Sequence, residues 1–156
     1  MIGCTDMGSE PVIDAGPPDM SAAMPQDRQF IALMAAYRPY RGISRLNWLS
    51  GGGRVRFDGL DSDVEALVSE RQMLAFAWDD EMWIPMFQFD GSGAAVSQGP
   101  HRVIAEWGGV LDGWALAHWF VRPNSWLGLH MPIELINSGL PDVLEAARAD
   151  RFVATT

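Results

Sequence analysis

The sequence predicts a mainly α-helical domain with one small β-hairpin, an α+β fold, behind a flexible leader. Of the 156 residues, 48% are hydrophobic, enough to fill the core of one domain. Apolar residues recur at helical spacing along most of the chain after residue 28, but they alternate between residues 73 and 89. Residues 1–27 hold five acids, four prolines and no basic residue, a composition that buries too little apolar surface to fold.

Charge divides the chain into three segments. Residues 1–27 have a net charge of −5, residues 28–57 carry six arginines and no acid, and residues 58–156 carry five arginines and fifteen acids. We interpret them as a flexible acidic leader, a short Arg-rich helical segment that is a candidate degenerate helix-turn-helix, and a compact helical C-terminal domain.

Three short helices are expected before residue 70. Asp27 is a suitable N-cap for a helix over residues 28–37, which Pro39 ends. The apolar residues Ile43, Leu46 and Leu49 suggest a second helix, closed by the glycines at 51–53. A third helix is expected to start at a capping box, with Ser62 as the N-cap and Glu65 as its reciprocal partner.

The period then changes to that of strands. The aromatic-rich runs 73–78 and 82–89 are separated by Asp79-Asp80-Glu81, which predicts a β-hairpin. Pro85 has no N–H to donate to a ladder, so we expect its strand to lie at a sheet edge. Residues 90–93, Asp-Gly-Ser-Gly, are expected to form a loop.

The remainder is expected to be helical. One apolar stripe at helical spacing follows Pro100. Asp112 is a suitable cap for a helix over residues 113–121. Pro132 and Pro141 each fit a helix start, with Gly139 between them. The last helix is expected over residues 141–150, leaving a short tail at 151–156.

Composition excludes several functions. All 11 basic residues are arginine, so the chain has no lysine for a phosphate loop, a Schiff base or general-base catalysis. The single cysteine, Cys4, allows no internal disulfide and no cysteine-based metal cluster. The net charge of −9 argues against broad nucleic-acid binding. With no membrane span or signal peptide recognised, we expect a cytoplasmic protein without a cofactor or metal.

No catalytic constellation emerges from the remaining polar residues. His101, His118 and His130 lack metal-ligand spacing, and His118 fits better as a packed or capping residue. The three consecutive acids Asp79-Asp80-Glu81 could form a cation site, but a solvated turn is the more common interpretation of such a run. An enzyme would need a cleft that brings together His101, Glu106 and a perturbed carboxylate.

Two groups of residues are candidates for binding. Five arginines within 19 residues could grip a DNA backbone, or pair with this chain's own acids: Arg38, Arg41, Arg45, Arg54 and Arg56. The helix expected after them opens with acids, which would repel phosphate. Near the C-terminus, Trp119, Arg122 and Trp126 flank a Pro-Asn break and are typical of binding hot spots, although core packing is the alternative.

The C-terminal part resembles a known family. Residues 119–128 (WFVRPNSWLG), 132–136 (PIELI) and 143–147 (VLEAA) resemble, in order and spacing, the toxin-binding domain of Xre/MbcA/ParS-type antitoxins. Residues 83–90 (WIPMFQFD) look like the hairpin strand of that family, with its Pro-x-Phe-Gln-Phe motif. The resemblance covers roughly residues 60–152, within the 58–156 segment.

The resemblance implies a non-enzymatic antitoxin of a type II toxin–antitoxin system. Such proteins are usually homodimers, and they cover the active site of a toxin with a RES domain, which consumes or uses NAD. Carried over by position, the toxin-binding residues are Trp119, Arg122, Asn124, Trp126, Leu127, Pro132, Arg148, Arg151 and Phe152. Many members also bind promoter DNA, so a DNA-binding regulator acting through residues 38–56 is the alternative function.

Overall fold

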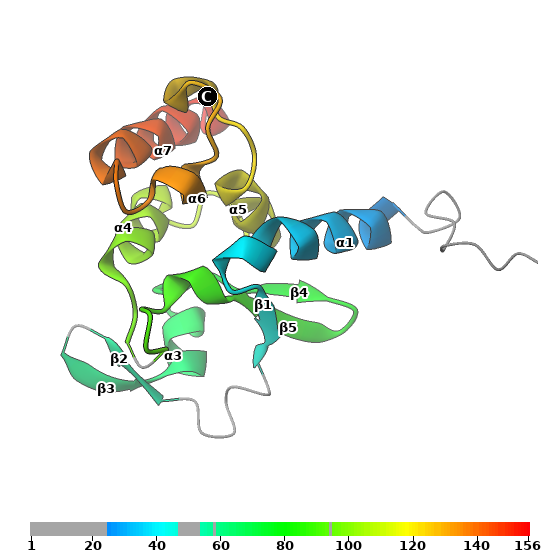
Figure 1. Ribbon diagram of the computed structural model, residues 1–156, viewed down its shortest axis with the longest axis vertical. Helices are drawn as coiled ribbons and strands as arrows, with labels where there is room; N and C mark the ends of the chain where they lie inside the picture. The colour runs from blue at the N-terminus through cyan, green and yellow to red at the C-terminus, as the bar shows by residue number, and fades with distance from the viewer. Residues whose placement is uncertain (1–24, 47–53, 58, 94) are drawn as a thin grey trace, which may run out of the picture.

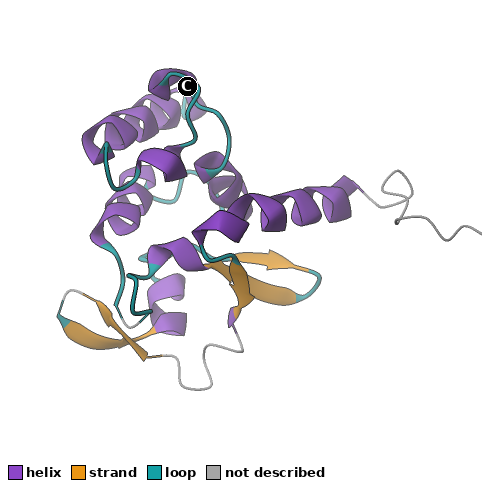
Figure 2. Ribbon diagram, viewed as in Figure 1, coloured by secondary structure: helices purple, strands orange, loops and turns teal. Residues whose placement is uncertain are grey.

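The computed structural model describes residues 25–46, 54–57, 59–93 and 95–156. Helices α4 to α7 form one half of the molecule, α3 and two small sheets form the other, and α1 lies between them (Figure 1). Figure 2 shows the strands confined to the second half. The predicted class, mainly α with a small β component, is confirmed. The leader expected at 1–27 lies outside the described residues up to position 24.

Helix α1 (Pro25–Tyr37) continues into a 3-10 turn, η3 (Arg38–Tyr40), at Pro39. The helix begins two residues before the expected N-cap, so Asp27 lies in its first turn. Phe30 buries one face of α1 by stacking on Trp78 with ring centroids 3.9 Å apart. At its end, the hydroxyl of Tyr37 donates to the carbonyl of Ala117 at 2.7 Å, which ties α1 to α5.

The predicted hairpin exists and gains a third strand. Strands β4 (Phe76–Trp78) and β5 (Glu81–Pro85) are antiparallel, and β1 (Ile43–Arg45) pairs with the other side of β5. The second helix expected around Ile43 is therefore wrong at that residue, and residues 47–53 lie outside the described chain. The expectation of an edge strand for Pro85 is also wrong, because β5 is central. Proline is tolerated there because the pairing with β4 ends at Trp83.

A second hairpin was not predicted. Strands β2 (Arg54–Phe57) and β3 (Leu60–Asp63) pair antiparallel and lead into the short helix α3 (Val64–Ser69). The N-cap of α3 is Asp63, whose carboxylate accepts from the amide of Glu65, rather than Ser62. Ser62 belongs to β3, and its hydroxyl donates to the Leu60 carbonyl. The N-cap of α3 therefore lies one residue after the expected position.

Buried Gln88 joins the hairpin to the preceding segment. The run 82–89 leaves strand geometry after Pro85 and becomes a 3-10 turn, η4 (Met86–Gln88). The Gln88 side chain accepts from the Leu74 amide at 2.6 Å and donates to the Leu74 and Pro85 carbonyls at 2.7 and 2.9 Å. This glutamine, the polar residue of the Pro-x-Phe-Gln-Phe motif, therefore substitutes for a missing strand neighbour.

The helical half is built on α4 (Gln98–Trp107) and α5 (Gly113–Phe120). Asp112 caps α5 as predicted, accepting from the Ala115 amide at 2.8 Å. Gly113 is required by close approach, because a Cβ there would overlap the carbonyl of Ala75. The helix thus packs its backbone directly against the segment that enters β4.

Three further elements complete this half: the 3-10 turn η5 (Ser125–Leu127), α6 (Pro132–Leu135) and α7 (Leu140–Ala154). Pro132 starts α6 as predicted. The last helix is longer than expected and continues through Ala154, so the predicted tail at 151–156 is wrong. Arg151 pairs with α4 and holds this last turn in place. These helices contribute to the larger core cluster, which includes Trp107, Phe120 and Val143.

Candidate functional site

The segment between α5 and α6 is a compact loop organised by Asn124. The backbone carbonyl of Asn124 accepts from the amides of Leu127 and Leu129 at 3.0 and 2.9 Å, and its own amide donates to the His130 carbonyl at 3.0 Å. Its side-chain oxygen accepts from the Trp126 amide at 2.8 Å, which makes it the N-cap of η5. The backbone and the buried side chain of Asn124 therefore together fix the path of residues 124–130.

Asp150 on α7 anchors this loop to the last helix. Its Oδ2 accepts from the Trp119 indole at 2.8 Å and from the Asn124 side-chain amide at 2.9 Å. Its Oδ1 accepts from the indole of Trp126 at 3.1 Å. Three donors from α5, the loop and η5 thus meet on one carboxylate. Hydrogen bonds to an ionised acceptor are stronger than neutral ones, so the positions of both indoles are well defined.

Large apolar side chains are exposed next to this anchor. Trp126 is 60% exposed, Leu129 69%, Phe152 68% and Val153 65%. Figure 1 shows η5 beside the C-terminal end of α7, the helix that contains Phe152 and Val153. We call these four residues the C-terminal surface. They are half of the exposed large hydrophobic residues in the described part of the chain, two in the loop at 124–130 and two on the last turn of α7.

Two features mark this surface further. Leu129 has a left-handed backbone with φ of +70°, a conformation that is costly for a leucine and is most often found at functional positions. Beside Trp126, a hollow of about 230 Å³ is lined by Trp119, Asn124 and Asp150 and bordered by exposed Arg122. The surface therefore combines apolar side chains with one cation at its rim.

The structure separates the nine carried-over residues into two groups. Trp126, Arg122, Arg148 and Phe152 are exposed, and Trp119 and Arg151 are partly exposed. Asn124, Leu127 and Pro132 are buried. These three cannot contact a partner directly as expected, because they are covered by the loop and helices that they hold in place.

Arg148 and Arg151 are engaged within the chain. Arg148 pairs with Glu106 on α4 at 3.2 Å and with Glu145 at 2.9 Å. Arg151 donates to the Glu106 carbonyl at 2.8 Å and lies 3.8 Å from its carboxylate. The hydrogen bond to Glu106 raises the pKa of the Arg148 guanidinium. Both arginines therefore fasten α7 to α4 instead of extending as a free tail.

The Arg-rich segment is also largely engaged with the rest of the chain. Arg41 donates to the carbonyls of Phe89 and Asp90. Arg45 pairs with Glu81 at 3.3 Å and lies over the Trp83 ring, and Arg54 pairs with Asp61 at 3.2 Å. Arg38 and Arg56 are exposed. The segment contributes two strands, β1 and β2, so the expected all-helical organisation is wrong in its described part.

The other candidates have separate surroundings. Nδ1 of His101 lies 3.2 Å from the Gln72 carbonyl oxygen, to which its N–H form donates, and the ring packs on Phe57. Glu106 instead contacts the two arginines of α7. Asp79 and Asp80 form the exposed turn of the β4–β5 hairpin with positive φ, as a two-residue primed turn requires. Within the described residues, no group of three or more His, Cys, Asp or Glu side chains is arranged to hold a metal ion.

Comparison with known proteins adds no relatives: no family model, curated protein or solved structure matches this chain. Among the helices of the described residues, none has the length and apolar character needed to cross a membrane.

Sequence reasoning missed Asp150, Leu129 and Val153. Asp150 lies 24 to 31 positions from its three donors, so only the folded chain brings them together. Leu129 follows a Leu-Gly step, and Gly128 also has positive φ. Such a glycine is a detectable turn signal, and it would have drawn attention to the residue after it.

Proposed function

We propose that this chain is a binding module of the antitoxin type, which inactivates a partner enzyme by covering its active site with the C-terminal surface. The observation that carries the proposal is the exposed indole of Trp126, held by Asp150 next to Leu129 and the end of α7. Exposed tryptophan fixed in one orientation is the residue type that dominates protein–protein binding energy.

Preorganisation supports a protein partner. Association costs free energy for each side chain that must be ordered, and a fixed side chain avoids that cost. Trp126 is held at its backbone by Asn124 and at its indole by Asp150. A loop built to present one large apolar ring is expected of a binding surface, whereas a solvent-facing loop without a partner needs no such arrangement.

The family resemblance adds the kind of partner. It suggests a toxin with a RES domain, whose NAD-binding cleft would be occluded. The exposed cation Arg122 at the rim is suited to acidic groups around such a cleft. We place the contact on η5, the turn after it and the last turns of α7. DNA binding through residues 38–56 stays a second hypothesis, and the internal pairing of Arg41, Arg45 and Arg54 does not favour it.

The test is co-expression with the protein encoded by the neighbouring gene, which the proposal requires to be a RES-domain toxin. The intact chain should restore growth and co-purify with the toxin in fixed stoichiometry. Trp126→Ala should weaken the complex by about 2 kcal/mol or more, as expected for a hot-spot residue. The matched control is Leu60→Ala on the β2–β3 hairpin, since Leu60 is a large apolar residue of similar exposure, 69% against 60% for Trp126.

Two results would contradict the proposal. The first is a neighbouring protein that neither binds this chain nor loses toxicity in its presence. The second is equal binding by Trp126→Ala and Leu60→Ala, which would place the contact elsewhere. A mobility shift with the chain's own upstream DNA, weakening steeply with salt, would instead support the DNA-binding hypothesis.

A further inference from the structure

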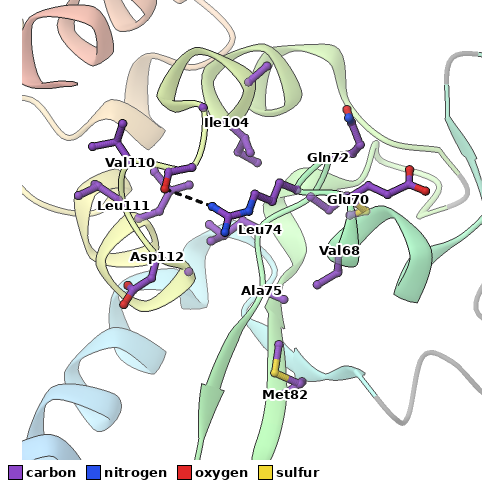
Figure 3. Close-up of a pocket in the computed structure, with 17 residues that line it drawn as sticks. Val68, Glu70, Gln72, Leu74, Ala75, Met82, Ile104, Val110, Leu111 and Asp112 are labelled. Atoms are coloured by element: carbon purple, nitrogen blue, oxygen red, sulfur yellow. Dashed lines mark hydrogen bonds between the residues drawn. The ribbon is translucent and has the colours of Figure 1, made fainter. Parts of the chain in front are cut away.

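A pocket of about 780 Å³ lies away from the C-terminal surface, between the segment after α3 and the turn that joins α4 to α5. Its volume is in the range typical of small-molecule sites. Figure 3 shows its apolar wall, to which Leu74, Ile104, Val110 and Leu111 contribute, with Met82 at one end. No residue of the C-terminal surface lines it.

Arg71 places a guanidinium in this pocket. Its backbone is left-handed, with φ of +60°, at the residue that follows the C-cap of α3, where glycine is the usual choice. An arginine at such a position costs some stability relative to glycine. From there its side chain reaches across the pocket, and Nη1 donates to the Gly109 carbonyl at 3.1 Å, the dashed line in Figure 3.

Gly109 is fitted to this arginine. It has φ of +83°, and a Cβ at this position would overlap Nη1 of Arg71. Only glycine therefore allows the guanidinium to approach the turn after α4 this closely. Arg71 and Gly109 are 38 residues apart in the sequence, and together they set the position of the guanidinium.

The acids that line the pocket do not neutralise Arg71. Figure 3 shows the Glu70 carboxylate pointing away from the guanidinium. Asp112 is committed to capping α5 through the Ala115 amide. Among the described residues, Arg45, Arg54, Arg148 and Arg151 each have a carboxylate within 4.0 Å, but the structure gives Arg71 only the Gly109 carbonyl. In a chain with 20 acids, this leaves a cation available beside an apolar wall.

We propose that this pocket binds a small organic anion, a carboxylate on an aliphatic or aromatic body. The carboxylate accepts from the remaining N–H groups of Arg71, whose planar fork matches two carboxylate oxygens. The apolar body lies against Leu74, Val110 and Leu111. This site is independent of the proposed antitoxin function, because it shares no residue with the C-terminal surface.

The test uses the full chain and three probes: phenylbutyrate, its neutral amide, and inorganic phosphate. In a two-dimensional amide NMR titration, phenylbutyrate should shift the resonances of Arg71, Gly109 and their neighbours with millimolar affinity or better. The neutral amide should bind at least about tenfold more weakly, because it cannot form the charge-assisted pair. Arg71→Met should show the same loss, and Arg102→Met, an exposed arginine of α4, should bind like the unmodified chain.

Gly109→Ala provides a second variant, since its Cβ displaces the end of the Arg71 side chain while keeping the charge. It should also lose phenylbutyrate while its other amide resonances match those of the unmodified chain, which excludes misfolding caused by an alanine at φ of +83°. If phosphate binds as well as phenylbutyrate, the apolar wall has no role and the proposed ligand class is wrong. A probe concentration of about 10 mM exceeds the dissociation constant expected of a fragment. If no probe shifts the pocket resonances at that concentration, the proposal is overturned. Arg71 is then a structural clamp, and Arg71→Met will lower stability without any binding phenotype.

Discussion

The Arg-rich segment and the C-terminal surface differ in how much of their binding capacity the fold leaves available. In the segment, Arg41, Arg45 and Arg54 contact carbonyls or carboxylates of the same chain. At the C-terminal surface, polar groups are also satisfied internally, but the apolar parts of Trp126, Leu129 and Phe152 stay exposed. A high local density of arginines in a sequence therefore does not mean that their charges are free to bind a partner. The exposed apolar side chains of the C-terminal surface, in contrast, are not covered by the chain itself.

The same comparison applies to the two regions' supporting interactions. The arginine pairs are exposed, with side-chain exposure of 55% and 56% for Arg45 and Arg54, and such pairs contribute little to stability. The loop at 124–130 is joined to α7 by a single carboxylate that accepts from three donors. Substitutions should therefore have unequal effects in the two regions.

The largest effect is expected at Asp150. Asp150→Ala removes the acceptor of three donors, two of them partly buried indole or amide groups. We expect a loss of about 2 kcal/mol in the free energy of unfolding, measured by urea denaturation. Asp142→Ala, an exposed acid in the first turn of the same helix, should lose less than about 1 kcal/mol. Equal losses for the two variants would mean that Asp150 does not anchor the loop.

An intermediate effect is expected at Tyr37, which ties the N-terminal helix to α5. Burial raises the pKa of Tyr37 well above its usual value, so the folded chain holds the phenolic proton to higher pH than the unfolded chain does. Its contribution is intact below about pH 10 and is lost as the pH rises above that, at up to about 1.4 kcal/mol per pH unit. Tyr37→Phe should cost about 1 kcal/mol at pH 7, from the lost bond to Ala117, and should reduce the alkaline slope.

The control for this experiment is Tyr40→Phe, measured by the same denaturation series from pH 8 to about 11. Burial, with a smaller effect of Glu134, also raises the pKa of Tyr40, but by less than the pKa of the fully buried Tyr37. Most of the alkaline slope should therefore remain in Tyr40→Phe. A slope that survives in Tyr37→Phe would instead show that a group other than Tyr37 causes the alkaline loss of stability.

The smallest effect is expected in the Arg-rich segment. Arg54→Met removes an exposed pair with Asp61 on the β2–β3 hairpin and should cost about 0.5 kcal/mol. Raising the salt concentration from about 0.1 M to about 1 M should reduce even that difference, since salt screens exposed charges. Thermal denaturation at the two concentrations measures it. A loss as large as that of Asp150→Ala would remove the contrast between the two regions.

Local signals predicted the elements that depend on neighbouring residues. The cap at Asp112, the start at Pro132 and the hairpin around Asp79 follow from interactions within a few positions, and the structure has all three. The second hairpin also had such a signal: Asp58-Gly59 between two short runs is a typical primed turn. The signal is weak because the first strand, Arg54-Val55-Arg56-Phe57, is only four residues long and two of the four are arginines.

Other features could not be predicted from neighbours. The third strand at Ile43 forms because β5 offers an unpaired edge, a property of the folded sheet. The last helix continues beyond Asp150 because Arg148 and Arg151 both bond to Glu106 of α4. Glu106 lies more than 40 positions earlier in the sequence. At the candidate site, residue types indicated Trp126 and Arg122. The role of Asp150 required the tertiary structure.

The bond from the Trp126 indole to Asp150 has a thermodynamic consequence for any molecule that covers this ring. An indole buried at an interface normally requires an acceptor from the partner, and without one its N–H is left unsatisfied. Here the N–H already has its acceptor in the same chain, while 60% of the residue stays in contact with water. Displacing that water needs only a surface of matching shape. Burial of this ring on binding should therefore give a negative change in heat capacity.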